Sequence, residues 1–210
     1  MEMNEYLKKE FKVSDSVLSI VDKAEKSVEE QFKRIDEICR INQIRVMKAF
    51  SDNRVSEAHF GATTGYGYDD FGRDTLDKVY AEVFGAEDAL VRFNFISGTH
   101  TISTALFGVL RPGDLLISAT GKPYDTLEEV IGIAGTPGNG SLKDYGVDYK
   151  QIDLLADGTA DFDSIKAILE SSKVKAALIQ RSKGYGDRPS YSADEVGKIA
   201  RAVHSVVVGF

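Results

Sequence analysis

Apolar residues recur every three or four positions through the first quarter of the chain, a spacing that predicts helix with one apolar stripe. The pattern runs from Ser14 to about residue 50, and Ser14, Asp15 and Ser16 offer caps for its start. Its length favours an arm or two consecutive helices, packed on the chain's own domain or on a second subunit. A plain helix facing the core is the alternative. The stripe comprises Val17, Ile20, Val21, Ala24, Val28, Phe32, Ile35, Ile38, Ile41 and Ile44, after which Val46, Met47 and Phe50 depart from it.

Beyond residue 85 the pattern changes, and short apolar runs alternate with helical spacing. This alternation indicates βαβ units and therefore an α/β fold, with a mainly parallel sheet and flanking helices. We expect a helical arm over residues 1–60 and a larger domain over 61–210. The predicted strands are 88–93, 115–118, 149–154 and 174–180, and the predicted helices between and after them are 99–110, a short one from 123, 161–171 and 192–204.

The bulk composition narrows the classes of function. The 210 residues are 42% hydrophobic and 28% charged, with a net charge of −7, which is ordinary for a globular protein. No basic stripe with interleaved aromatic residues suggests a nucleic-acid partner. No apolar run is long enough to span a bilayer, and the acidic start lacks the features of a signal peptide. We therefore expect no nucleic-acid or membrane partner and a cytoplasmic location.

Metal and cysteine chemistry are not expected. The single cysteine, Cys39, excludes an intrachain disulfide and a cysteine-based metal cluster. It lies within the first helical pattern, where a small buried hydrophobe is expected rather than a nucleophile. His59, His100 and His204 lack the spacing of metal ligands with one another. No metal site is predicted.

A hydroxyl-rich turn stands between a predicted strand and a predicted helix. It contains Ser97, Gly98 and Thr99. Free backbone N–H groups and the positive end of a helix dipole meet at such a junction, which makes it a natural seat for a phosphate. Gly98 would let the backbone approach the ligand, and the two hydroxyl groups add donors. The alternative is an ordinary helix cap, because Ser and Thr are favoured there without any ligand.

Three turns, at 95–101, 119–125 and 181–190, each follow a predicted strand. Ligands of parallel sheets bind at the carboxyl ends of the strands, so we expect these turns to lie along one edge. Tyr124 could then lie flat against an aromatic ring held beside the phosphate. Arg181 could offer a planar fork to a carboxylate or phosphate. Together these groups predict a pocket for a phosphorylated aromatic cofactor.

A glycine-rich segment at 60–74 is the other stretch that suggests function. It has four glycines in a short span with Tyr66, Tyr68 and Arg73. Its glycine spacing does not fit the dinucleotide fingerprint, and no strand precedes it. Loops of this kind often carry function, and its side chains could approach the predicted pocket.

Taken together, these motifs resemble one branch of the pyridoxal-phosphate-dependent Cys/Met-metabolism enzymes. The branch comprises the aluminium-resistance proteins, also described as cystathionine β-lyase-like and related to methionine γ-lyase. The resemblance covers nearly all of the chain, from the first helical pattern to about His204. The segments that carry it are 64–73, 84–92, 97–100, 111–114, 123–127, 180–185 and 188–190.

The resemblance implies a fold-type-I, aspartate-aminotransferase-like large domain that binds pyridoxal 5′-phosphate. The turn at 97–99 would bind the phosphate, and Tyr124, the expected catalytic residue, would stack on the pyridine ring. Tyr66 or Tyr68 would reach the phosphate of the neighbouring subunit's cofactor, in a homodimer or homotetramer with active sites at the subunit interface. The implied reaction is α,β- or α,γ-elimination from a sulfur amino acid.

The sequence departs from this family at one decisive place. In the family, the aspartate that pairs with the pyridinium and the Schiff-base lysine both follow the helix that matches 192–204. No lysine here matches that position, and Lys122 is interpreted as a surface or phosphate-side charge. We therefore expect the N-terminal half of a carbon–sulfur lyase, inactive by itself, with the valines at 206–208 beginning the next strand or marking an abrupt join. The alternatives are a non-catalytic module for a phosphorylated ligand, or an oligomerisation protein with a vestigial pocket.

Overall fold

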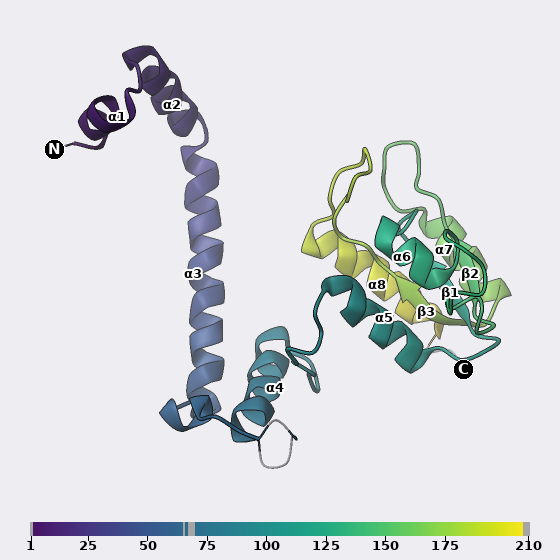
Figure 1. Ribbon diagram of the computed structural model, residues 1–210. Coiled ribbons are helices and arrows are strands. Elements are labelled where there is room, and N and C mark those ends of the chain that lie inside the picture. The colour runs from purple at the N-terminus through teal and green to yellow at the C-terminus, as the bar shows by residue number, and fades with distance from the viewer. Residues whose placement is uncertain (1, 65, 67–69, 208–210) are drawn as a thin grey trace. The chain divides into compact units, whose positions relative to one another are not determined.

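A computed structural model describes residues 2–64, 66 and 70–207. The chain divides into two compact units, Met1–Phe93 and Asn94–Phe210, each of which is described by itself. The first is helical and the second is a mixed α/β unit with a small parallel sheet (Figure 1). The expected α/β class is thus confirmed at this level, while the domain boundary expected near residue 60 stays a prediction.

The first unit resolves the long helical pattern into two helices that meet at Val28. Ser14 caps the first of them, because its hydroxyl accepts the N–H of Val17. A further helix, which periodicity did not predict, precedes them. The helices of this unit are α1 (Met3–Phe11), α2 (Asp15–Ser27), α3 (Glu29–Asp52), the 3₁₀ turn η1 (Glu57–Phe60) and α4 (Phe71–Phe84).

The C-terminal end of α3 packs on α4. Ala49 is fully buried, and Asn53 Nδ2 donates to Glu82 Oε2 at 2.9 Å. Farther along α3 most apolar side chains are exposed, and Cys39 is exposed with them. The expectation that Cys39 is a buried hydrophobe was therefore wrong for this chain, because no element described in its unit packs over that part of α3.

The strand expected at 88–93 is not formed. Asp77 of α4 takes the bonds that a neighbouring strand would have made: its Oδ1 accepts the N–H of Val91 at 2.8 Å and Nη1 of Arg92 at 2.7 Å. The segment 88–93 is therefore an irregular connection that the Asp77 side chain holds in place. Its apolar alternation was compatible with a strand, but here no strand in the described residues pairs with it.

The second unit is built on three parallel strands in the order β2–β1–β3. The central strand β1 is buried along its whole length, as its unbroken apolar run predicts. Its elements are α5 (Gly98–Val109), β1 (Leu115–Ser118), α6 (Asp125–Ile131), β2 (Asp148–Gln151), α7 (Phe162–Ser171), β3 (Val174–Leu178) and α8 (Ala193–Val207).

Helices cover both faces of this sheet. Successive side chains of a strand point to opposite faces. Leu116 joins one apolar cluster with Leu106 of α5 and Leu127 of α6. Ile117 joins another with Ile165 of α7 and Ile199 of α8. The two clusters fix β1 at the centre and bring its carboxyl end beside the start of α5.

Expectations at the ends of three elements were wrong: β3, expected to reach residue 180, ends at Leu178. β2 ends at Gln151, not at Leu154, because its partner β1 ends at Ser118 and the chain then turns at Gly121, where φ is +79°. Val206 and Val207 belong to α8, which continues past His204 without a proline to end it, so they do not begin a strand. The third valine lies outside the described residues. Among the helices that are described, none is long and apolar enough to cross a membrane.

Candidate functional site

A pocket of about 380 Å³ lies at the carboxyl ends of β1 and β3, where the sheet topology predicts ligand binding. It is formed wholly within the second unit. None of its lining residues carries a formal charge, so the electrostatics of the pocket come from dipoles and hydroxyl groups. The lining residues are Gly98, Thr99, Ile102, Ser118, Pro123, Tyr124, Thr126, Leu127, Leu178, Ile179, Gln180 and Ser182.

The start of α5 forms one wall of this pocket. Ser97 is the N-cap, and its hydroxyl accepts the N–H of His100 at 3.1 Å, so Ser97 does act as an ordinary cap. The N–H groups of Gly98 and Thr99 make no hydrogen bond within the described part of the chain. No acidic side chain lies in the first turn, so the positive end of the helix dipole is not neutralised there.

The space in front of these amides is open. A Cβ placed on Gly98 would meet no atom within 4 Å. The Thr99 hydroxyl lies 2.8 Å from that of Thr126 in α6, which ties the starts of the two helices together. Unpaired amides, an uncompensated helix dipole and open space are the features that a bound phosphate requires. The residues present therefore fit a phosphate group.

Tyr124 forms the opposite wall. Its ring stacks on that of Tyr185, with the centroids 5.7 Å apart and the planes inclined by 23°. Its backbone N–H donates to Gln180 Oε1 at 2.7 Å. The Tyr185 hydroxyl, hydrogen-bonded to it, raises the pKa of Tyr124, so its phenol stays protonated at neutral pH. The ring is 37% exposed and presents a flat surface to a ligand.

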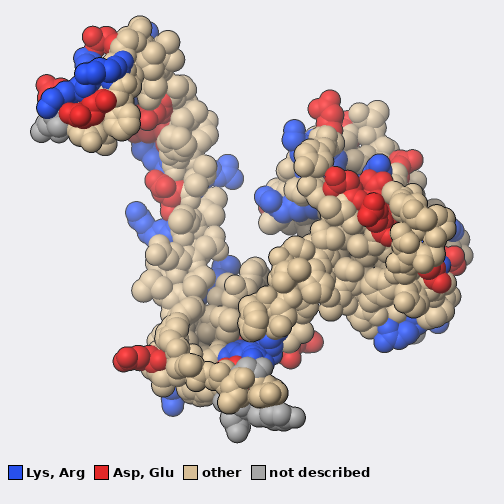
Figure 2. Space-filling model, in the orientation of Figure 1, with Lys and Arg blue, Asp and Glu red and all other residues tan. Residues whose placement is uncertain are grey.

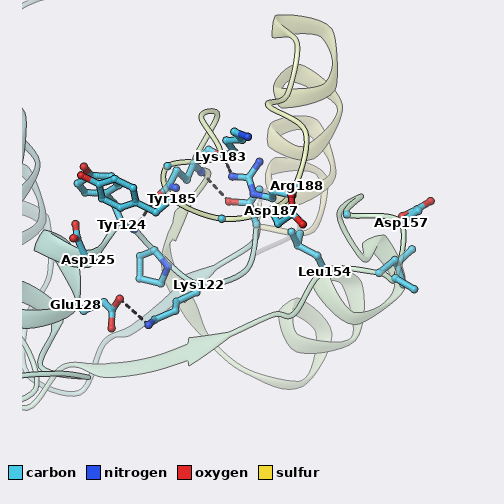
Figure 3. Close-up of a pocket in the computed structure, with 18 residues that line it drawn as sticks. Lys122, Tyr124, Asp125, Glu128, Leu154, Asp157, Lys183, Tyr185, Asp187 and Arg188 are labelled. Atoms are coloured by element: carbon cyan, nitrogen blue, oxygen red, sulfur yellow. Dashed lines mark hydrogen bonds and ion pairs between the residues drawn. The ribbon is translucent and has the colours of Figure 1, made fainter.

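A second pocket, of about 650 Å³, lies on the other side of Tyr124 (Figure 3). Lys122 on its wall forms an ion pair with Glu128, with Nζ and Oε1 2.9 Å apart. The amine is therefore held by a carboxylate, in agreement with its interpretation as a surface charge. The polar loop that carries Tyr185 and Arg188 closes this pocket above the strand ends.

The other predicted site residues are not all brought to the first pocket. Arg181 is exposed and lines neither of the two pockets described. Tyr66 belongs to the first unit and is 84% exposed. Tyr68 lies outside the described residues. Arg73 is held in an ion pair by Asp70, with Nη2 and Oδ2 3.0 Å apart.

Gln180, Tyr185 and Arg188 are site residues that the sequence reasoning did not single out. Gln180 closes the apolar run that predicted β3, and a polar residue at the carboxyl end of a buried strand is the signal that could have found it. Tyr185 lies between two glycines, and from this pattern the sequence predicts only that it belongs to a loop. Gln180 and Tyr185 share a partner, Tyr124, that is distant in the chain, and Arg188 bonds to Gln180, so only folding shows the connection.

These features define an α/β protein with a pocket at the carboxyl edge of its parallel strands, suited to a phosphate beside a flat ring. The chain belongs to the methionine gamma-lyase family, whose pattern it matches over residues 17–208. The resemblance inferred from the motifs is thereby confirmed, including its aluminium-resistance branch.

Similar proteins agree with this assignment. A carbon-sulfur lyase involved in aluminum resistance from Clostridium novyi NT is 42% identical, with a TM-score of 0.90 over 98% of this chain and 49% of its own. A Clostridium acetobutylicum protein, also named for aluminum resistance, is 44% identical with a TM-score of 0.91, over 98% of this chain and 49% of its own. The Bacillus subtilis (strain 168) protein YnbB is 52% identical over 83% of this chain and 41% of its own length. The chain thus spans about half the length of these relatives.

Proposed function

We propose that the complete protein is a pyridoxal-phosphate-dependent carbon–sulfur lyase, and that this chain supplies its phosphate and ring-stacking site. The observation that carries the proposal is the meeting of two elements in one pocket. The unpaired amides of Gly98 and Thr99 lie on one wall and the Tyr124 ring lies on another. Family membership and the name of the Clostridium novyi relative support it.

In this proposal the fold is the large domain of a fold-type-I enzyme, and the substrate is a sulfur amino acid. When bound, the cofactor supplies an electron sink for cleavage of a carbon–sulfur bond. The start of α5 binds the phosphate dianion through two N–H groups, and its dipole contributes about 0.3–1 kcal/mol, or up to about 2 in a partly buried geometry. Tyr124 orients the ring by offset stacking, which contributes about 0.5–1.5 kcal/mol beyond burial.

Tyr124 also holds a proton beside the proposed ring. Its phenol pKa is raised, by the hydrogen bond with Tyr185 above all, so the hydroxyl keeps its proton at neutral pH. A protonated phenol at the ring edge can move a proton to a departing group, whereas a phenolate would repel electron density there. In this proposal Tyr124 therefore both positions the ring and supplies a proton.

We further propose that the complete protein is a homo-oligomer whose subunits meet on α3. Seven apolar side chains recur along it at steps of three residues, and each is between 40% and 63% exposed: Phe32, Ile35, Ile38, Ile41, Ile44, Met47 and Phe50. Three residues turn about 300° around a helix, which is about 60° short of a full turn. Each apolar side chain therefore lies about 60° around the helix from the one before it. In the half of α3 that packs on α4, apolar side chains therefore project on opposite sides.

Apolar side chains on opposite sides of a helix are normally covered by packed neighbours. In the first unit α4 covers only the end of α3 around Ala49. On the face shown in Figure 2, the half of α3 nearer to α4 is mostly tan and shows fewer charged side chains than the other half. A second copy of the same helix offers a matching apolar surface, which supports a subunit contact there.

The test is made on the full-length gene product. We expect the purified protein to absorb visible light when supplied with pyridoxal phosphate, and borohydride to abolish the band and label one lysine. Release of pyruvate or 2-oxobutyrate from cystathionine, cysteine or methionine would then identify the elimination. A colourless protein that takes up no cofactor contradicts the proposal, and reversible binding without turnover supports the non-catalytic alternative instead.

A further inference from the structure

Gln180 connects the end of β1, the turn that carries Tyr124 and the loop at 181–190. Its side-chain Oε1 accepts the N–H of Tyr124 at 2.7 Å, and its Nε2 donates to the carbonyl of Ser182 at 3.0 Å. Its own N–H donates to Oγ1 of the buried Thr120 at 2.8 Å, and its carbonyl accepts from Arg188 at 2.9 Å. Both side-chain polar groups and both backbone groups are thus used, so the amide has one defined orientation.

Arg188 fixes the loop that follows Gln180. Its Nη2 donates to the carbonyls of Gln180 and Ser182, and its Nη1 donates to the carbonyl of Pro189. The guanidinium also lies 4.7 Å from the centroid of the Tyr191 ring. A planar guanidinium with three carbonyl partners and an aromatic face has little freedom. The loop at 181–190 is therefore closed on itself and carries Tyr185 at a set position.

This loop contacts the Tyr124 ring directly. Gly184 has φ of +59°, and a Cβ added there would lie 3.1 Å from Cδ2 of Tyr124. Glycine is needed at this position both for its backbone conformation and for the close approach. The Tyr185 ring, next in the chain, stacks on Tyr124, and Figure 3 shows the two rings lying together.

Gly184 and Tyr185 contact the Tyr124 ring on one of its two sides. Tyr124 lines both pockets, but Gly184 and Tyr185 line only the larger one, whereas Gly98 and Thr99 line only the smaller one. Tyr185 therefore supports Tyr124 from the side away from the α5 amides. The side toward those amides is left for the ligand.

We infer that Gln180 and Tyr185 are positioning residues, which hold the Tyr124 ring in the orientation that a flat, phosphate-bearing cofactor stacks on. The inference rests on the proposed function for the identity of the ligand. It predicts that loss of either contact weakens recognition of the ring and leaves recognition of the phosphate unchanged. The phosphate wall is formed by α5, and within the described residues neither side chain is hydrogen-bonded to that helix.

The experiment uses the full-length protein and pyridoxine 5′-phosphate, which has the ring and the phosphate but no aldehyde to bond to a lysine. Affinity is measured by calorimetry, and ring orientation by the circular dichroism induced in the ring's absorption band. Inorganic phosphate, titrated by phosphorus NMR, reports on the α5 wall alone. The variants are Gln180→Leu and Tyr185→Ala, with Gln151→Leu on β2 and Tyr185→Phe as matched controls.

We expect Gln180→Leu and Tyr185→Ala to weaken pyridoxine 5′-phosphate binding about tenfold, the size of a lost stacking contact. The induced dichroism should fall, while the affinity for inorganic phosphate should stay within about twofold. Tyr185→Phe should restore both ring readouts because it keeps the stacked ring. Gln151→Leu should change neither, since that exposed side chain is hydrogen-bonded to Asp153, outside both pockets.

The outcomes distinguish failure of the proposed function from failure of the positioning role of Gln180 and Tyr185. A wild-type protein that binds no pyridoxine 5′-phosphate overturns the proposed function, and the inference with it. Wild-type binding with unchanged affinity and dichroism in both variants overturns only the inference. Equal loss of ring and phosphate binding also overturns it, because the effect would then be general. Thermal melts check folding, and if Gln180→Leu does not fold, the comparison of Tyr185→Ala with Tyr185→Phe decides.

Discussion

Gln180 accepts the backbone N–H of Tyr124 across 56 residues of sequence, at a distance of 2.7 Å. This bond links the end of β3 to the turn before α6, and so connects two strand ends at the edge where ligands of parallel sheets bind. Because it is made to the backbone, it survives any change of the Tyr124 side chain. Substitutions of Tyr124 can therefore test the ring by itself.

Tyr124→Phe should keep cofactor affinity, since the stacking surface remains, whereas Tyr124→Leu should weaken it about tenfold. Turnover should fall in both, because both lose the phenol proton. Binding is measured by the visible absorbance of pyridoxal phosphate titrated into the full-length protein. Equal affinities in the Phe and Leu variants would show that the ring does not stack.

Gly98→Asp should weaken phosphate recognition. The new carboxylate would lie at the unpaired amides and repel a dianion, so we expect at least about a tenfold loss of affinity for pyridoxal phosphate. Gly98→Ala should bind normally, because its Cβ meets no atom within 4 Å. Gly108→Asp adds the same charge about 15 Å farther along α5 and is the charge control. A Gly98→Asp protein with unchanged affinity would rule out the α5 amides as the phosphate site.

Ile44→Glu should lower the molecular mass of the full-length protein in solution. Ile44 is 60% exposed in the apolar stripe of α3, and a carboxylate there would be desolvated in a subunit contact. Light scattering coupled to chromatography measures the mass. Gln43→Glu, one residue earlier on α3, introduces the same group outside the apolar stripe and should leave the mass unchanged. If both variants keep the wild-type mass, the contact lies elsewhere.

Asp144 should make stability depend on pH. Backbone N–H groups of Gly138, Ser141 and Gly140 and the Ser141 hydroxyl donate to its carboxylate, and these bonds lower its pKa. A lowered native pKa stabilises the fold above the unfolded value of about 3.9, and this stabilisation is lost as pH falls through the native value.

Asp144→Asn should therefore lower the melting temperature at neutral pH, and the difference from wild type should shrink at acidic pH. Melting curves from pH 3 to pH 7 measure it. Asp148→Asn is the control, because that exposed carboxylate accepts no hydrogen bond within the described residues. A difference that is constant over the pH range would contradict the ionic origin.

Gly72→Ala should destabilise the first unit. A Cβ there would lie 2.2 Å from the carbonyl oxygen of His59, so either η1 or the start of α4 must move. We expect a loss of about 1–3 kcal/mol, the usual cost of overpacking, from chemical denaturation. Gly108→Ala, whose Cβ meets nothing within 4 Å, should cost nothing. Equal stabilities would mean that the close approach is not maintained in solution.

The local sequence pattern was sufficient to predict most helices and strands of the second unit. The run Leu115–Ser118 has no polar interruption until its last residue, and it is the buried central strand. Asp161 and Ser192 were followed by helices, because their side chains cap the first turns. The segment 88–93 shows the limit, since its apolar alternation fits a strand but its backbone bonds go to Asp77.

The motifs around Ser97 and Tyr124 could likewise be recognised as a phosphate turn and an aromatic residue after a strand. Their meeting in one pocket followed from the parallel topology and is found in the structure. Arg181 was expected there by the same argument but is directed to solvent, and Arg188 holds the loop instead. The two arginines look alike in sequence, because the carbonyls that Arg188 binds belong to a loop that forms only on folding.

By itself, the sequence determined the helical arm, the α/β order of the second unit, and the family, because these depend on periodicity and on residues close together in the chain. The tertiary structure alone decided which side chains surround Tyr124. Gln180, Gly184 and Tyr185 reach it through hydrogen bonding and ring contacts between distant segments. Such contacts have no period in the sequence, since they depend on how β1 and β3 lie side by side.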